Sequence, residues 1–186
     1  MWLRDPALHR SLRLATALTI AGLAAACFQP LYGERAVGGG SAVRDALAAV
    51  DVAQIDAPKG TALARIAVET RNELVFDLTG GGGSAPQTHR LTIRLIPTRN
   101  TIVVDPITQR NEFDSFGLDA HYTVTEIVSG KTVVTGSATT RVTYNVPGQQ
   151  QRFARTRALR DAETRAAKLI AEQIRSRLAS YFVAGT

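Results

Sequence analysis

The segment 129–132, Ser-Gly-Lys-Thr, could form the end of a phosphate-binding loop, and it is the first candidate for chemistry in this 186-residue chain. Such a loop requires a glycine where this sequence has Thr125, and it is followed by a helix, whereas a strand is expected here. The glycine run 80–83 lacks the lysine and hydroxyl residue that would have to follow it. We therefore expect no nucleotide site, and we interpret Ser129-Gly130 as a hairpin turn.

Carboxylates and histidines are the other groups that could support catalysis. Asp114, Asp119 and Glu126 could act as paired carboxylates, but strand alternation places Asp119 on the face opposite the other two. Acids at strand edges are usually solvated. His89 and His121 are far apart in sequence and have no cysteine partner, and the Gly-x-Ser-x-Gly pattern of an activated serine does not occur. We expect a protein that is not an enzyme and that has no metal site and no cofactor.

Arginines are the best candidates for binding an anion, because the planar guanidinium group matches the oxygens of phosphate and carboxylate. Arg90 and Arg94 share one face of a predicted strand. The start of the last predicted helix carries four more: Arg152, Arg155, Arg157 and Arg160. The positive end of the helix dipole disfavours cations there by roughly 0.3–1 kcal/mol per charge unless an anion compensates. An anion-binding patch and a merely solvated surface both remain open for this cluster.

The N-terminal residues resemble a bacterial export signal. Residues 1–13 carry three arginines and one aspartate, and residues 14–26 carry no charge. This uncharged stretch is too short to cross a bilayer as a helix, so we interpret residues 1–26 as a signal peptide. The signal ends in Leu-Ala-Ala-Ala before Cys27, the single cysteine of the chain, and this junction resembles the lipobox of bacterial lipoproteins. We therefore predict lipidation at Cys27 and a membrane anchor of several acyl chains.

The positive charge of the chain is concentrated near its C-terminus. The formal net charge is +6, and it becomes +4 once the signal peptide, with three basic residues and one acidic residue, is removed. Residues 152–186 hold eight basic and three acidic residues. A basic segment would suit nucleic acid in another compartment, but an exported lipoprotein meets anionic lipid or polysaccharide instead. We expect no nucleic-acid partner.

Hydrophobic periodicity predicts one α+β domain. The chain is 45% apolar and 20% charged, so it can bury a single core. The expected strands are 50–55, 89–104 with a break at Pro97, 116–124 and 134–146, and the expected helices are 61–77 and 152–182. The economical packing places two helices on one face of a four-stranded, mostly antiparallel sheet in the order β-α-β-β-β-α. The other face of the sheet would then be exposed.

Composition also sets the expected boundaries of the chain's parts. The signal peptide covers residues 1–26, and the lipidated N-terminus with its linker covers 27–48, including a flexible Gly-Gly-Gly-Ser stretch at 38–41. The single α+β domain covers 49–186.

Three parts of the sequence carry a resemblance to a known family. The segment 27–33, Cys-Phe-Gln-Pro-Leu-Tyr-Gly, directly follows the signal. The predicted strand at 50–55 and the hairpin strands come next, and the tail runs from Arg152 to Phe182. Together these parts, which cover nearly all of the chain after the signal, resemble the lipopolysaccharide-assembly lipoprotein family LptE in its alphaproteobacterial form.

That resemblance implies a lipid-anchored protein on the periplasmic side of the outer membrane. Members of the family plug the β-barrel of LptD, and the two proteins together insert lipopolysaccharide into the outer leaflet. An LptD-like barrel, lipopolysaccharide and the membrane are therefore the expected partners. The expected lipopolysaccharide-binding residues are the arginines Arg90, Arg94, Arg152, Arg155 and Arg157.

Two other classes of protein stay open at this point. A lipid-anchored auxiliary component of an ABC-type transport system would have a similar size, the same anchor and a mixed α and β content. A lipoprotein hydrolase would also be anchored in this way, although the sequence offers no nucleophile with its base. Co-purification of a partner distinguishes a transport-system component from an LptE-like protein, and a screen for hydrolase activity tests the second class.

Overall fold

The computed structural model describes residues 43–82, 85–104, 107, 111–146 and 151–184. The predicted signal peptide, Cys27 and the glycine-rich linker at 38–41 lie outside these residues.

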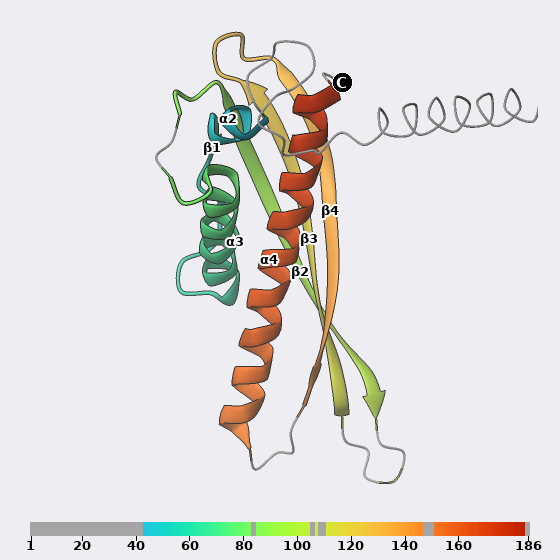
Figure 1. The fold of residues 1–186 in the computed structure, drawn as a ribbon. Coiled ribbons are helices and arrows are strands. Elements are labelled where there is room, and N and C mark those ends of the chain that lie inside the picture. The colour runs from blue at the N-terminus through green and yellow to red at the C-terminus, as the bar shows by residue number, and fades with distance from the viewer. Residues whose placement is uncertain (1–42, 83–84, 105–106, 108–110, 147–150, 185–186) are drawn as a thin grey trace, which may run out of the picture.

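Three helices and four strands form the described part of the chain: α2 (Val43–Ala48), β1 (Val50–Val52), α3 (Ala62–Thr79), β2 (His89–Val104), β3 (Asn111–Glu126), β4 (Thr132–Asn145) and α4 (Arg152–Ala184). The strands make one sheet in the order β1-β2-β3-β4, in which β1 is parallel to β2 and the other pairs are antiparallel. Figure 1 shows α3 and α4 on one side of this sheet. The predicted α+β class and its β-α-β-β-β-α order are confirmed.

The predicted helix 61–77 is present as α3, which begins one residue later and ends two residues later. The Thr61 side chain accepts a hydrogen bond from the Ala64 N–H at 3.2 Å, which satisfies one free donor of the first turn. At the other end, the Gly80 N–H bonds to the Phe76 carbonyl oxygen at 2.8 Å. Because α3 lies between β1 and β2 in the chain and these two strands are parallel neighbours, the helix forms the crossover that joins them.

The predicted break of the strand at Pro97 is wrong, because β2 runs through this residue without interruption. The Ala53 N–H bonds to the Leu91 carbonyl oxygen at 2.9 Å, so odd-numbered residues of β2 direct their backbone groups toward the β1 side. Strand β1 pairs only with residues 89–91, which leaves the edge of β2 at Pro97 unpaired. A proline lacks an N–H donor, and it fits a strand where that donor would have no partner.

The N-terminal boundary of the folded region differs from the expectation. Residues predicted as linker form the short helix α2, whose Val43 and Leu47 are buried in the core. Strand β1 is also shorter than the predicted 50–55, since it ends at Val52. The core of the domain thus includes residues before position 49.

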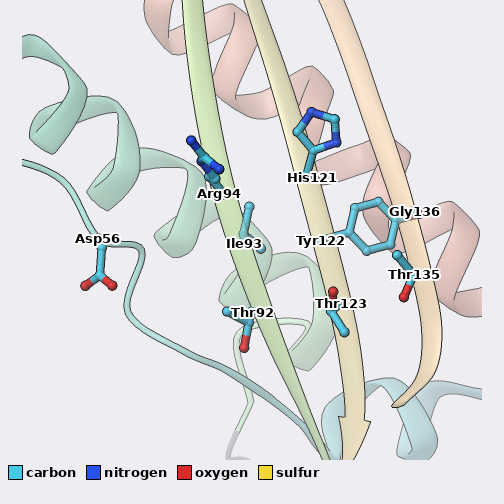
Figure 2. Close-up of a pocket in the computed structure, with 9 residues that line it drawn as sticks. All are labelled: Asp56, Thr92, Ile93, Arg94, His121, Tyr122, Thr123, Thr135 and Gly136. Atoms are coloured by element: carbon cyan, nitrogen blue, oxygen red, sulfur yellow. The ribbon is translucent and has the colours of Figure 1, made fainter.

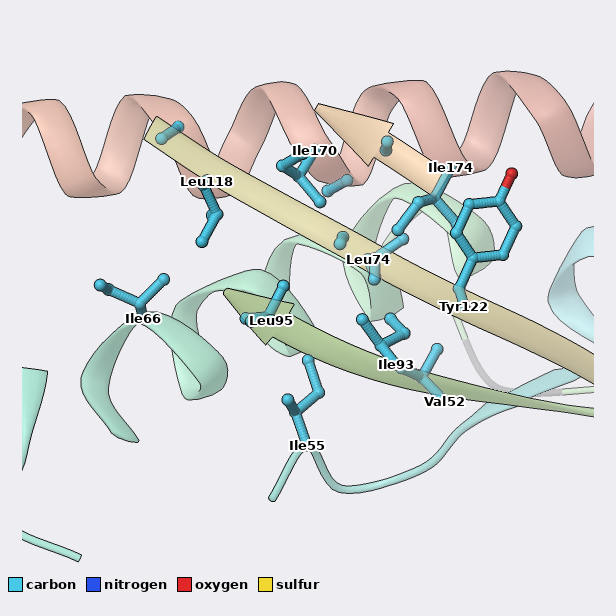
Figure 3. Packing of buried hydrophobic residues seen from close by; sticks show 14 of the residues in the cluster. Val52, Ile55, Ile66, Leu74, Ile93, Leu95, Leu118, Tyr122, Ile170 and Ile174 are labelled. Carbon is cyan, nitrogen blue, oxygen red and sulfur yellow. The ribbon is translucent and has the colours of Figure 1, made fainter. Parts of the chain in front are cut away.

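The core lies between the sheet and the two long helices (Figure 3). Leu118 of β3 and Leu91 of β2 are fully buried there, together with Leu74 of α3 and Ile170 of α4. The buried stripe of α4 is rich in alanine, with Ala162, Ala166, Ala167, Ala171 and Ala179 fully buried. Small side chains let this 33-residue helix lie close to α3 and to strands β3 and β4.

Candidate binding surface on the open sheet face

The face of the sheet opposite the helices is polar, and none of the described helices covers it. Because side chains alternate along a strand, the residues next to the buried ones point to this side. The following residues make up what we call the open face: Thr92, Arg94, Ile96, Thr98, Ser115, Gly117, Asp119, His121, Thr123, Thr135, Ser137, Thr139, Arg141 and Thr143. Most of their side chains end in a hydroxyl or a charged group, so this face can form hydrogen bonds with a polar partner.

The strand register arranges the open face in rows across β2, β3 and β4. Thr92, Thr123 and Thr135 form a row of three hydroxyl groups. In the next row, Arg94 lies directly beside His121. The arrangement depends on pairing between strands, and the sequence alone could not show it.

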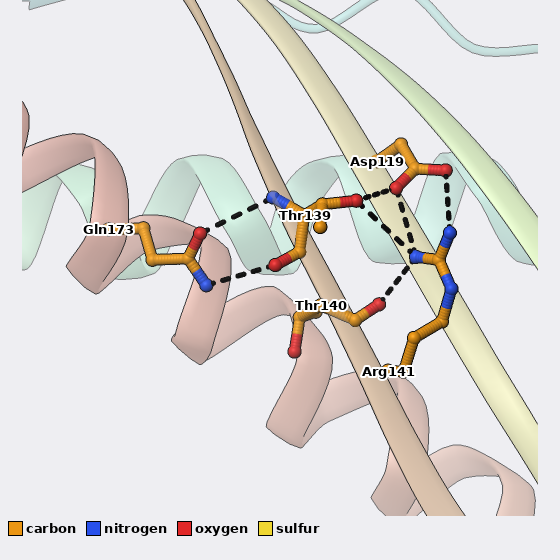
Figure 4. A network of polar contacts seen from close by, with 5 residues as sticks. All are labelled: Asp119, Thr139, Thr140, Arg141 and Gln173. Carbon is orange, nitrogen blue, oxygen red and sulfur yellow. Dashed lines mark hydrogen bonds and ion pairs between the residues drawn. The ribbon is translucent and has the colours of Figure 1, made fainter.

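In the next two rows along the open face, Asp119 of the first and Arg141 of the second neutralise each other. The two Arg141 guanidinium N–H groups donate to the two Asp119 oxygens at 2.9 and 3.2 Å, and the Thr139 hydroxyl also donates to Asp119 (Figure 4). The hydrogen bond with Asp119 raises the pKa of Arg141. Gly117 leaves room for this arrangement, since a Cβ atom there would lie 2.8 Å from the Arg141 Cδ. This part of the face therefore presents no net charge.

The α4 helix closes part of the β4 edge through one side chain. The Thr139 N–H donates to the Gln173 amide oxygen at 3.3 Å, and the Gln173 amide nitrogen donates to the Thr139 carbonyl at 3.2 Å (Figure 4). The side-chain amide thus takes the place of a neighbouring strand, which blocks pairing with another chain at this point. No sequence signal pointed to Gln173.

A hollow of about 490 Å³ opens on the other half of the open face (Figure 2). Arg94 and His121 line it, together with the threonine row. Asp56, from the segment after β1, lies on its opposite side. Within the described residues, neither Arg94 nor His121 forms a hydrogen bond or an ion pair. Among the described residues, Arg94 is thus a cation without an ion-pair partner at close range, and Asp56 is the acid that lines the far side of the same hollow. A cation placed in this way is a feature that an anion would recognise.

The five predicted lipopolysaccharide-binding arginines do not form one patch. Arg90 is occupied by an ion pair with Asp51 at 3.0 Å. Arg94 lies in the hollow on the open face. The other three stand at the start of α4: Arg152, Arg155 and Arg157. The start of β2 lies beside the opposite end of α4, since His89 and Phe182 are in ring contact at 5.2 Å. The helical cluster is therefore about 40 Å from that end of the domain.

The strand acids are only partly as expected. Asp119 lies on the face opposite Asp114, as predicted, but the expectation that Asp114 is solvated is wrong. Asp114 is buried on the face of the sheet that the helices cover. There it accepts hydrogen bonds from Arg99 at 3.3 Å, Thr101 at 3.1 Å and Tyr144 at 3.3 Å. Burial raises the pKa of Tyr144, which keeps its hydroxyl able to donate to this carboxylate.

The remaining sequence motifs have structural roles. The Ser129 hydroxyl donates to Glu126 at 2.5 Å, and the Gly130 N–H bonds to the Glu126 carbonyl at 2.9 Å, so the predicted hairpin turn is confirmed. In the part of the chain that the structure describes, no group of three or more histidine, cysteine or acidic residues could hold a metal ion. None of the described helices is long and apolar enough to span a membrane.

Comparison with known proteins finds similarity in structure and none in sequence. No protein-family model and no curated protein matches the sequence. The chain is similar to a presumed lipoprotein from Caulobacter crescentus CB15, with a TM-score of 0.59 and 19% identity, over 77% of this chain and 97% of the other. It is also similar to the rare lipoprotein B from Shewanella oneidensis, with a TM-score of 0.50 and 16% identity, over 73% of this chain and 95% of the other. The described domain therefore has the fold found in these two proteins.

Proposed function

We propose that this chain is an outer-membrane lipoprotein, anchored through Cys27, which plugs an LptD-like β-barrel and takes part in inserting lipopolysaccharide into the outer leaflet. Its role in this proposal is binding, and it catalyses no reaction. The observation that carries the proposal is the uncovered polar sheet face, in a domain whose fold is shared with two proteins described as lipoproteins. The lipobox-like junction at Cys27 and the segment 27–33 support the same reading.

The open face suits the lumen of a barrel for a physical reason. The inner wall of a large outer-membrane barrel is polar, so a plug gains stability when its own surface offers donors and acceptors. The rows of threonine hydroxyls and the neutral Asp119–Arg141 pair provide these groups and bring little net charge that would have to be desolvated.

The end of the domain near the start of α4 suits the binding of lipopolysaccharide, which has both charged phosphates and apolar acyl chains. Arg152, Arg155 and Arg157 stand there beside Phe153, which is 89% exposed. The β2–β3 hairpin reaches the same end, because Phe113 pairs with Asn145 shortly before α4 begins, and the hairpin exposes Ile102 and Ile107. Guanidinium groups next to exposed apolar side chains match the phosphates and acyl chains of lipid A.

Extraction of outer membranes in mild detergent, with a tag after Thr186, tests the partner. We expect a large β-barrel of the LptD type to co-purify with the wild-type chain and to be lost with Thr123→Trp, which places a bulky ring in the middle of the open face. Lys168→Trp, on the exposed side of α4, is the matched control and should retain the barrel. Recovery of an inner-membrane transporter instead would favour the ABC-type alternative, and mass spectrometry that finds no acylated Cys27 would contradict the anchor.

Lipopolysaccharide binding is tested separately at the helical cluster. Replacing Arg152, Arg155 and Arg157 together with glutamate should abolish lipopolysaccharide binding while the far-UV circular dichroism spectrum stays native. Unchanged binding by this triple variant would reject the site.

A further inference from the structure

The hollow on the open face is a second candidate site, distinct from the helical arginine cluster. It is built from β2, β3 and β4 on one side and from the segment after β1 on the other (Figure 2). Arg94 and His121 are direct cross-strand partners, so their side chains leave the sheet next to each other. The neighbouring row adds the hydroxyl groups of Thr92, Thr123 and Thr135.

The charges around the hollow single out Arg94. On one side, Arg90 pairs with Asp51 at 3.0 Å, and on the other side Arg141 pairs with Asp119 at 2.9 Å. Among the described residues that line the hollow, Asp56 is the one acid that faces Arg94 and His121. These two neighbouring side chains have no hydrogen-bond acceptor within the described part of the chain, so an anion placed between them would gain charge-assisted hydrogen bonds.

We propose that this hollow binds a phosphate group, held by the Arg94 guanidinium and the His121 imidazole with the threonine row as additional donors. Phosphate fits better than carboxylate because its three or four oxygens can accept from more of these donors than two oxygens can. Asp56 fits a phosphate that still carries a proton, since a P–O–H group can donate to its carboxylate. The proposal does not depend on the barrel or on lipopolysaccharide.

Titration of the full-length chain in detergent with inorganic phosphate tests the site, with the His121 ring signals in the NMR spectrum as the readout. We expect a saturable shift of these signals. Arg94→Gln should weaken phosphate binding at least about tenfold, because a charge-assisted hydrogen bond is lost. Absence of a saturable shift in the wild-type chain would overturn the proposal.

The matched control is Arg141→Gln, which also removes one positive charge from the open face. Arg141 already has Asp119 as its partner, so this variant should keep phosphate affinity within about twofold of the wild type. An equal loss in both variants would mean that phosphate responds only to the general charge of the protein, and the proposal would be wrong. Circular dichroism spectra confirm that both variants are folded.

Two further arms identify the source of the phosphate and the part played by His121. Vesicles that contain phosphatidic acid should displace inorganic phosphate if the natural ligand is a lipid headgroup, and they should leave it bound if the ligand is a soluble phosphate. His121→Ala removes the imidazole, and it should weaken phosphate binding as measured by isothermal titration calorimetry, because one donor of the site is lost. An unchanged phosphate affinity in His121→Ala would remove His121 from the site.

Discussion

The two faces of the sheet differ although they are built from adjacent residues of the same strands. On β3, Leu118 is fully buried beneath the helices, whereas the next residue, Asp119, lies on the open face in an ion pair with Arg141. The covered face holds the large apolar side chains, and between the described helices α3 and α4 the half-exposed Arg65 pairs with the buried Glu163. The comparison suggests that stability depends mainly on the covered face, which leaves the residues of the open face available for a partner.

The largest expected effect comes from removing a fully buried side chain on the covered face. Leu118→Ala leaves a cavity below α4 and should lower the free energy of unfolding by about 3–4 kcal/mol. Thr123→Ala, on the open face of the same strand, should change it by no more than about 0.5 kcal/mol. Urea unfolding of both variants measures the difference, and similar losses would contradict the division between the two faces.

The next effect concerns the tight contact between Gly136 and Tyr122 on the covered face. A Cβ atom at Gly136 would lie 2.7 Å from the Tyr122 Cζ and 2.5 Å from its hydroxyl oxygen. Gly136→Ala should therefore destabilise the domain by about 1–3 kcal/mol, as overpacking does. Adding Tyr122→Leu should recover part of that loss, whereas Ser137→Ala on the open face should have almost no effect. Thermal unfolding of the wild type and these three variants gives the comparison, and a Gly136→Ala variant as stable as the wild type would show that the ring can move aside.

The ion pair between α3 and α4 tests how the covered face tolerates charge. Arg65 donates to the buried Glu163 at 2.5 Å, and about half of the Arg65 side chain is exposed. Arg65→Ala leaves the Glu163 carboxylate buried without its partner and should cost about 1–3 kcal/mol. Adding Glu163→Gln removes the stranded charge and should return part of the stability. Urea unfolding would count against this account if the double variant were less stable than Arg65→Ala.

The smallest effect is expected for the corresponding ion pair on the open face. Arg141→Ala leaves Asp119 in contact with water and with the Thr139 hydroxyl, so the loss should be at most about 1 kcal/mol. High salt should reduce this loss further, because exposed charges are screened. An Arg141→Ala variant destabilised as much as Arg65→Ala would show that the open face also contributes to the stability of the fold.

Much of the fold could be predicted from the sequence because its signals are local. The period of apolar residues identified α3, α4 and the strands of the β3–β4 hairpin, and Ser129-Gly130 marked the turn between those strands. Each signal depends on residues within a few positions of one another. The short helix α2 had no such signal, since six residues are too few to show a period.

The candidate sites could be predicted only in part, because single residues were visible but their neighbours were not. Arg94 was identified as an anion-binding candidate from its place on a strand face. Its pairing with His121 and the occupation of Arg90 by Asp51 depend on which strands lie next to each other and in which register. The buried network of Asp114 was missed for the same reason.

The sequence by itself determined the long helices and strands and which side of each is apolar, because both follow from the fixed periods of the helix and the strand. Only the tertiary structure decided that Pro97 lies on an unpaired edge, that Asp119 neutralises Arg141, and that Arg94 has no such partner among the residues that the structure describes. These outcomes depend on contacts between residues far apart in the chain, and those contacts exist only once the sheet has its register and the helices cover one of its faces.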